Sequence, residues 1–145
     1  MPHFIIVVPV DGSEPSMHAV DHAVGLAQSR SDAEIVLVNV QNLALLDLGD
    51  AAAIMPPDWE TKAMEQAAKT ALVPAQRRAA GKGIAVAVRQ ENGPVAETIA
   101  RLAEELGATQ IVMGTRGLGG VRGLFMGSVA TQLVHLSKVP VTLVK

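Results

Sequence analysis

Residues 4–13, FIIVVPVDGS, decide the fold class of this chain of 145 residues. The run Phe4–Val10 is apolar and largely β-branched, which predicts a strand buried on both faces, as in a parallel sheet. Asp11-Gly12-Ser13 then has turn chemistry, and Ser13 can cap a helix over Pro15–Ser29. A buried strand therefore leads directly into an amphipathic helix, whose apolar residues recur at helical spacing: Met17, Val20, Ala23, Val24 and Ala27.

The same alternation of strand and helix continues along the chain. Apolar runs predict four further strands, at Glu34–Val40, Ile84–Gln90, Gln110–Met113 and Val139–Val144. Helical patterns with start and stop residues predict helices over Trp59–Ala80, Pro94–Leu106 and Ser128–Leu136. This order predicts an α/β fold, a single doubly wound parallel sheet with helices on both faces. Such sheets bind ligands at the carboxyl ends of the strands, where the strand order switches.

The connection over residues 41–57 has no clear period. Loops of this length usually act as lids, binding loops or mobile segments. Asp58 is expected to cap the helix that follows, and Pro74 is expected to kink it. An apolar patch beside the connection consists of Met55, Pro56 and Trp59. These residues can pack in the core, or they can form a surface for a partner protein.

Composition narrows the classes of function. A chain of this length with 49% hydrophobic residues fits one domain over residues 1–145 and excludes intrinsic disorder. The net charge of −2 and the aromatic content of 2% argue against a nucleic-acid partner, because neither a basic surface nor a stacking platform is expected. The absence of cysteine excludes disulfides, thiolate nucleophiles and cysteine-based metal sites.

No targeting or membrane segment is expected. The first apolar run has no Lys or Arg before it and is followed at once by Asp11, which is unlike a signal peptide. No stretch reaches the roughly 18 apolar residues that a transmembrane helix needs. The sequence therefore predicts no membrane insertion and a cytoplasmic location.

The loop between residues 114 and 127 holds six of the 13 glycines. Glycine permits positive φ and a close approach of the backbone to a ligand, and the loop leads into a predicted helix N-terminus. Ser128 is expected to cap that helix and to offer its hydroxyl to a phosphate. From Leu106 to Lys145 there is no Asp or Glu, whereas Arg116 and Arg122 lie inside the loop. These features indicate a phosphate site, although the two arginines can also be solvated surface charges.

Two common phosphate-binding motifs are absent. Gly81-Lys82-Gly83 does not complete the P-loop pattern, and the dinucleotide pattern that would begin at Gly117 fails at Arg122. The loop instead has Gly114-x2-Gly117-x9-Gly127-Ser128, which resembles the nucleotide-binding signature of the universal stress protein family. The resemblance extends over the whole chain, from the start IVVPVDGS through VLVNV and NGPV to the ending VPVTLV.

This resemblance implies a strand order of 3-2-1-4-5, with the nucleotide between the first and fourth strands. It implies ATP, or ADP or AMP, as the ligand, with Asp11 either accepting from the ribose hydroxyls or helping to hold Mg²⁺ or Mn²⁺ beside the nucleotide. That carboxylate is also suited to cap the turn into the first helix. Val38 lies two residues before Val40 on the same face of its strand, and Arg116 lies within the loop where it can reach a phosphate. The cofactor-binding residues that the resemblance implies are Pro9, Val10, Asp11, Val40, Met113, Gly114, Arg116, Gly117, Gly127, Ser128 and Val129.

Two further expectations come from the resemblance. The family often has His at the position of Asn39, so this chain departs from the pattern there. The family also implies a homodimer that pairs the C-terminal strands, Val139–Val144, and such pairing would cover an otherwise unpaired apolar edge.

Three functions remain open at this point. The favoured one is a regulatory module in which ATP changes the shape of residues 41–57, a segment that can engage a partner protein. A slow ATP hydrolase or phosphotransferase is the alternative, although no second metal-binding carboxylate lies near the glycine loop in the sequence. A nucleotide-free dimeric scaffold is the third. No catalytic residue is assigned, because the serines lack a hydrolase motif and His18 with His22 fits a surface pair better than a metal site.

Overall fold

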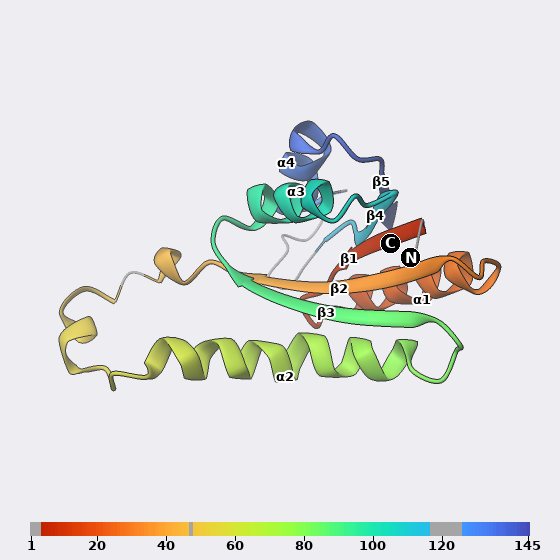
Figure 1. Cartoon of the computed structure of the whole chain (residues 1–145). Coiled ribbons are helices and arrows are strands. Elements are labelled where there is room, and N and C mark those ends of the chain that lie inside the picture. Colours follow the sequence, from red (N-terminus) through yellow and green to blue (C-terminus); the bar gives the residue numbers. More distant parts are fainter. Residues whose placement is uncertain (1–3, 47, 117–125) are drawn as a thin grey trace.

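The computed structural model describes residues 4–46, 48–116 and 126–145, which form a five-stranded parallel sheet in the order β3-β2-β1-β4-β5 (Figure 1). The strands are β1 (Phe4–Pro9), β2 (Ala33–Gln41), β3 (Ala85–Asn92), β4 (Gln110–Gly114) and β5 (Val141–Val144). The helices are α1 (Glu14–Gln28), α2 (Trp59–Ala79), α3 (Val95–Glu105) and α4 (Ser128–Leu136). The predicted sheet and its strand order are confirmed. No helix in the described parts of the chain is long and apolar enough to cross a membrane.

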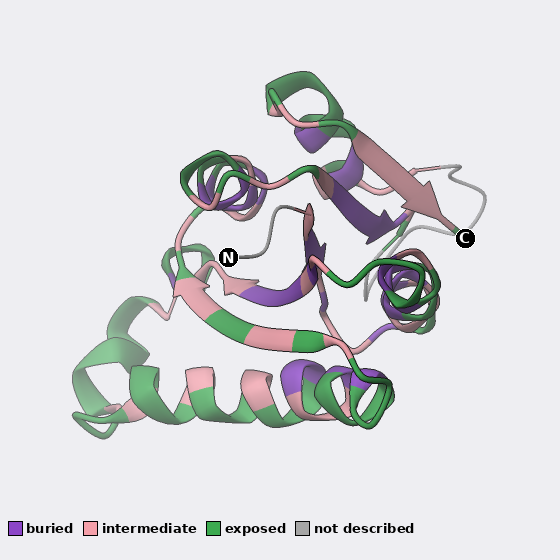
Figure 2. Ribbon diagram, turned by 45° about the vertical axis from the view of Figure 1, so that its right-hand side comes forward, coloured by how far each residue is buried: buried purple, intermediate pink, exposed green. Residues whose placement is uncertain are grey.

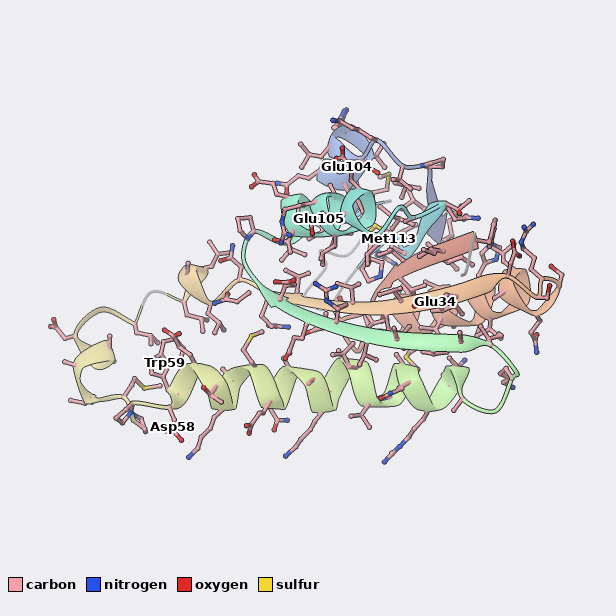
Figure 3. All side chains as sticks on the ribbon, viewed as in Figure 1. Glu34, Asp58, Trp59, Glu104, Glu105 and Met113 are labelled. Atoms are coloured by element: carbon pink, nitrogen blue, oxygen red, sulfur yellow. The ribbon has the colours of Figure 1, made fainter. Side chains whose placement is uncertain are left out.

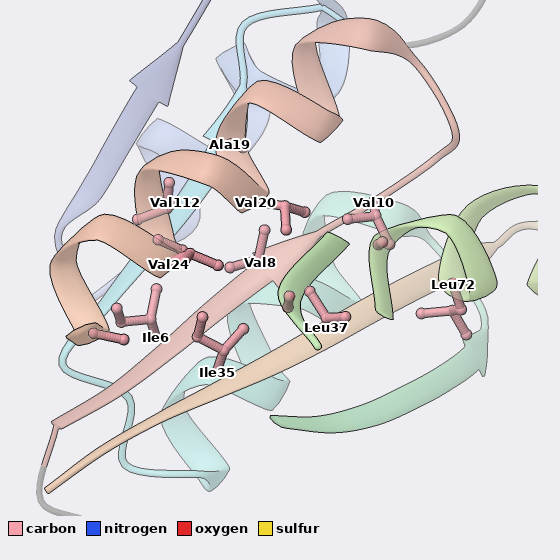
Figure 4. Packing of buried hydrophobic residues seen from close by; sticks show 14 of the residues in the cluster. Ile6, Val8, Val10, Ala19, Val20, Val24, Ile35, Leu37, Leu72 and Val112 are labelled. Carbon is pink, nitrogen blue, oxygen red and sulfur yellow. The ribbon is translucent and has the colours of Figure 1, made fainter. Parts of the chain in front are cut away.

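Two helices cover each face of the sheet. On β1, Ile6 and Val8 pack in the cluster with α1 and α2, which Figure 4 shows from close by, whereas Val7 packs in the cluster with α3 and α4. All three side chains have no exposed surface. A strand covered on both faces needs apolar residues at every position, which is why the start of the sequence is a continuous apolar run.

Strand β1 lies at the centre of the sheet and pairs on both edges. It pairs with β2 over its whole length and with β4 through Ile6 and Val7. The chain leaves β1 toward α1 on one face and leaves β4 toward α4 on the other. The two connections therefore diverge at the carboxyl ends of β1 and β4, where the strand order reverses.

Some local predictions need correction. Strand β5 begins at Val141 rather than Val139, because Pro140 has no amide to donate; its carbonyl instead accepts from Ile111 at 2.8 Å. Asp58 is at the N-cap of α2 as predicted, but it makes no capping hydrogen bond with its side chain, and its carboxylate pairs with Lys62 at 3.3 Å. Pro74 lies inside helix α2, as the sequence predicted, and the helix runs on to Ala79.

The part of the molecule between β2 and the middle of α2 is loosely packed. It holds two short 3₁₀ turns, Leu43–Leu45 and Gly49–Ile54, where the sequence predicted no regular structure. This segment extends away from the sheet (Figure 1). Residues 59–70 of α2 include no buried side chain, whereas the second half of the helix is held by four (Figure 2): Ala71, Leu72, Ala75 and Ala79.

Candidate functional site

A cavity of about 220 Å³ opens at the carboxyl ends of β1 and β4. Ten residues that the sequence assigned to a nucleotide site line it: Pro9, Val10, Asp11, Val40, Met113, Gly114, Arg116, Gly127, Ser128 and Val129. The remaining assigned residue, Gly117, lies outside the described residues, as do Gly119, Gly120, Arg122 and Gly123. The structure thus brings together segments from the two ends of the chain around one cavity.

The turn after β1 fixes the position of Asp11. The Val10 amide continues the pairing with β2 by donating to the Val38 carbonyl at 2.8 Å. One carboxylate oxygen of Asp11 accepts from the Ser13 amide at 2.9 Å, and Ser13 in turn caps α1 by accepting from the Ser16 amide at 3.3 Å. The predicted capping roles of Asp11 and Ser13 are therefore confirmed, and Asp11 lines the cavity at the same time.

The end of β4 is packed tightly against the start of α1. A Cβ atom at Gly114 would lie 2.8 Å from two atoms of Pro15, a distance that real side chains do not show. Glycine is therefore required here for close approach, and its φ lies outside the left-handed region. Beyond it, the Thr115 amide donates to the Val144 carbonyl at 2.9 Å, and the Gly127 amide donates to the Thr115 carbonyl at 2.6 Å. The two ends of the glycine-rich loop are thus joined beside the cavity.

Helix α4 begins at the cavity, but its cap differs from the prediction. Gly127 is the N-cap residue and Ser128 is the first residue of the helix, so Ser128 does not cap it. Gly127 has a φ of −75° and a ψ of 168°, so it does not use the positive φ that glycine permits. No side-chain cap satisfies the first turn. Since the first amides of a helix lack intrahelical acceptors, this end of α4 is suited to an anion.

The lining has two chemically different parts. One part is apolar and comes from β2, α3 and β4: Val38, Val40, Val95, Ile99 and Met113. The other part holds the N-terminus of α4 and the exposed side chain of Arg116, both of which favour negative charge. Among the described lining residues, Asp11 is the only carboxylate.

Sequence reasoning missed several residues at or behind this cavity. The lining also includes Val95, Ile99, Thr115 and Ala130, which were not assigned to the site, although Val95 ends the NGPV motif and Thr115 lies inside the glycine signature. Asn39 was noticed only as a departure from the family pattern. It is 1% exposed, and its amide nitrogen donates to the Val10 carbonyl at 2.9 Å. A polar residue inside the apolar run VLVNV was the signal for it.

Other candidates from the sequence lie elsewhere. Nδ1 of His18 is 2.8 Å from the Lys145 carbonyl oxygen and its Nε2 is 3.8 Å from Glu14. No group of three or more metal-ligating side chains occurs among residues 4–46, 48–116 and 126–145. Trp59 lies at the start of α2, away from Met113 at the cavity (Figure 3), and it is partly exposed, like Met55. The interpretation of that apolar patch as part of the core is therefore wrong.

The comparison with known families now decides the identity of the fold. The model of the universal stress protein family matches residues 4–145. This chain belongs to the universal stress protein family. Universal stress protein YxiE of Bacillus subtilis is 31% identical to it over an alignment of 145 positions, which covers 97% of this chain and 97% of that protein. The family match begins at the start of β1, includes the positions of the glycine signature and extends past β5.

Solved structures agree with this assignment of the fold. The structure of the protein MJ0577 superimposes with a TM-score of 0.85 at 23% identity, covering 100% of this chain and 97% of that one. A universal stress protein crystallised in complex with cAMP has a TM-score of 0.67 at 26% identity, covering 99% and 98%. A universal stress protein of Archaeoglobus fulgidus in complex with dAMP has a TM-score of 0.70 at 22% identity, covering 100% of both chains.

Proposed function

We propose that this universal stress protein binds an adenine nucleotide, primarily ATP, in the cavity between β1 and β4. We further propose that it acts as a nucleotide-responsive regulatory protein. The observation that carries the proposal is the convergence of ten signature-derived residues on one cavity. The relative that was crystallised with cAMP supports an adenine nucleotide as the class of ligand.

The two parts of the lining suit the two parts of a nucleotide. The apolar wall with Val38, Val40 and Met113 fits the faces of an adenine ring. The uncapped first turn of α4 and Arg116 fit phosphate oxygens. Asp11 lines the same cavity on the chain that leaves β1, so its carboxylate can accept from ribose hydroxyls or hold a divalent cation bound to the phosphates.

A divalent cation fits this chemistry only in company with the nucleotide. Mg²⁺ usually takes one or two protein carboxylates and fills its other positions with water and substrate phosphates. Asp11 is the carboxylate that the described lining offers for Mg²⁺ or Mn²⁺. When bound, the cation would neutralise phosphate charge. We therefore propose binding and signalling as the main function and slow hydrolysis as the alternative, because an attacking water needs a further positioning group.

The proposal includes the oligomeric state and a partner. Strand β5 lies at the edge of the sheet, and its four side chains are partly exposed. Pairing with β5 of a second copy would remove that edge and give a homodimer. The exposed side chains of Leu45, Leu46 and Ile54 make the 41–57 segment the proposed contact for a regulatory protein.

The first test is the nucleotide content of protein purified without added nucleotide. The protein is denatured and the supernatant is analysed by chromatography and mass spectrometry. Stoichiometric ATP supports tight binding with slow turnover, and mainly ADP or AMP supports the hydrolase. A protein that carries no nucleotide and shows no heat of binding with ATP and Mg²⁺ or Mn²⁺ would refute the nucleotide proposal and leave the scaffold.

A pair of matched variants assigns the binding to this cavity. Gly127→Val places a side chain at the cap of α4 inside the lining, so ATP affinity should fall more than tenfold in a folded protein. Gly25→Val makes the same change where a Cβ meets nothing within 4 Å, and ATP affinity should stay unchanged. Asp11→Ala should weaken binding less than Gly127→Val. Equal affinity for all three variants by calorimetry would place the nucleotide elsewhere.

A further inference from the structure

Asn39 is a buried amide on an apolar face of the sheet. Its neighbours at alternate positions of β2, Ile35 and Leu37, belong to the core beneath α1 and α2. A buried polar side chain without partners is strongly destabilising, so each polar atom of Asn39 needs a partner. The Val10 carbonyl only accepts, so the amide nitrogen of Asn39 must face it, at 2.9 Å. The amide oxygen then accepts from two glutamines.

The two glutamines connect Asn39 to different places. Nε2 of Gln41, from the same strand, donates to the Asn39 oxygen at 3.2 Å. Nε2 of Gln90, from β3, donates to the same oxygen at 3.2 Å and also to the Met64 carbonyl of α2 at 2.8 Å. Only the Gln90 bond therefore extends the chain of hydrogen bonds from the nucleotide cavity to a helix on the outside of the sheet.

The Val10 end of this chain lies in the proposed nucleotide site. Val10 follows the last residue of β1 and lines the cavity together with Asp11. The hydrogen bond from Asn39 fixes the Val10 carbonyl. This carbonyl belongs to the peptide bond between Val10 and Asp11. The orientation of the Asp11 backbone therefore depends on a side chain from the opposite face of the sheet, since Val38 and Val40 are the β2 residues on the cavity side.

The Met64 end lies in the loosely packed half of α2. Residues 59–70 include no buried side chain, so packing holds this half weakly. A second, open cavity of about 410 Å³ is lined by residues of this helix half and of β3, with Met64 and Gln90 among them. The Gln90 bond joins these two sides of the cavity. A helix half with so little buried contact can respond to the loss or gain of one hydrogen bond.

We propose that Asn39 is a positioning residue of the nucleotide site, and that the hydrogen-bond chain through Val10, Asn39, Gln90 and Met64 couples this site to the first half of α2. The coupling rests on the proposed function, because it needs a nucleotide at Val10 and Asp11. It supplies a physical path by which ATP changes the helix half that follows the exposed 41–57 segment.

The test compares two glutamine variants by hydrogen exchange and calorimetry. Gln90→Met removes the link to α2, and Gln41→Met removes a bond of the same length to the same oxygen without touching α2. In the wild-type protein, ATP with Mg²⁺ should slow amide exchange in residues 59–70 by about fivefold or more, as a coupling of roughly 1 kcal/mol requires. Gln41→Met should keep this protection, and Gln90→Met should lose it while ATP affinity stays within about threefold of wild type.

Asn39→Leu tests the positioning role. Loss of the bond to Val10 should lower ATP affinity by about tenfold, the upper range of one hydrogen bond, and should also abolish the protection of residues 59–70. If this variant does not fold, the glutamine pair still decides the coupling. Equal protection in Gln90→Met and Gln41→Met with intact ATP binding overturns the coupling and leaves the proposed function standing. A wild-type protein that binds no ATP overturns both, and calorimetry alone identifies that case.

Discussion

The contact between Gly114 and Pro15 makes a sharp prediction for Gly114→Ala. The added Cβ would lie 2.8 Å from the carbonyl carbon and from Cβ of Pro15, whereas ordinary contact begins at 3.4 Å. The end of β4 and the start of α1 would therefore have to separate by about 0.6 Å. Helix α1 cannot move cheaply, because Ala19, Val20 and Ala23 have no exposed surface. Overpacking of this kind costs about 1–3 kcal/mol.

This cost is measurable by thermal and urea denaturation. For a chain of this length, about 1–3 kcal/mol corresponds to a fall in Tm of roughly 3–10 °C. Gly25→Ala is the matched control, because its Cβ meets nothing within 4 Å on the exposed side of α1. Alanine is the better helix former by about 0.5–1 kcal/mol, so the Tm of this variant should rise. If Gly114→Ala is as stable as the wild type while Gly25→Ala gains stability, the tight packing of β4 on α1 is refuted.

Three further predictions concern the core, the sheet edge and the ion pair between α1 and α2. Leu102→Ala should lower the free energy of unfolding by about 2–5 kcal/mol in urea denaturation, because Leu102 has no exposed surface in the α3–α4 core; a smaller loss would mean that the site collapses around the deletion. Val141→Lys or Leu143→Lys should give monomers or aggregates in light scattering, and an unchanged dimer mass would contradict pairing through β5. The Arg78 guanidinium donates to Asp21 and lowers the pKa of that carboxyl below its ordinary value of 3.8. Asp21→Asn should therefore lower the stability slightly at neutral pH, because both side chains of the pair are about half exposed. The difference in Tm from the wild type should vanish as the pH falls through the lowered pKa of Asp21. A difference in Tm that persists below that pKa would exclude the ion pair as its cause.

Much of the fold could be predicted because the determining patterns are local. A parallel strand that is covered on both faces must be apolar at every position, and the run Phe4–Val10 shows this pattern. The cap at Ser13 also depends only on a few neighbouring residues. The boundary of β5 was wrong by two residues because apolar character continues through Val139, although Pro140 cannot donate to the ladder.

The candidate site was predictable in its residue types and less so in its geometry. The glycine spacing and the start of the sequence led to ten residues that line one cavity. The reasons assigned to the glycines were partly wrong. Gly127 adopts an ordinary extended conformation, and Gly114 is needed because a helix from the other end of the chain approaches it. A spacing pattern records that a glycine is present, and it does not record which segment comes close to it.

The sequence by itself determined the alternation of buried strands and amphipathic helices, the family, and the residues that gather at the switch point, because periodicity and motif spacing are properties of neighbouring positions. Only the tertiary structure decided which distant groups meet. Asn39 makes hydrogen bonds with Val10, 29 positions away in the sequence, and with Gln90, 51 positions away. Gly114 packs against Pro15, which comes from the other end of the chain. These contacts depend on strand order and register, which place whole elements side by side. A polar residue in an apolar run or a glycine in a loop does not record which distant segment it will meet.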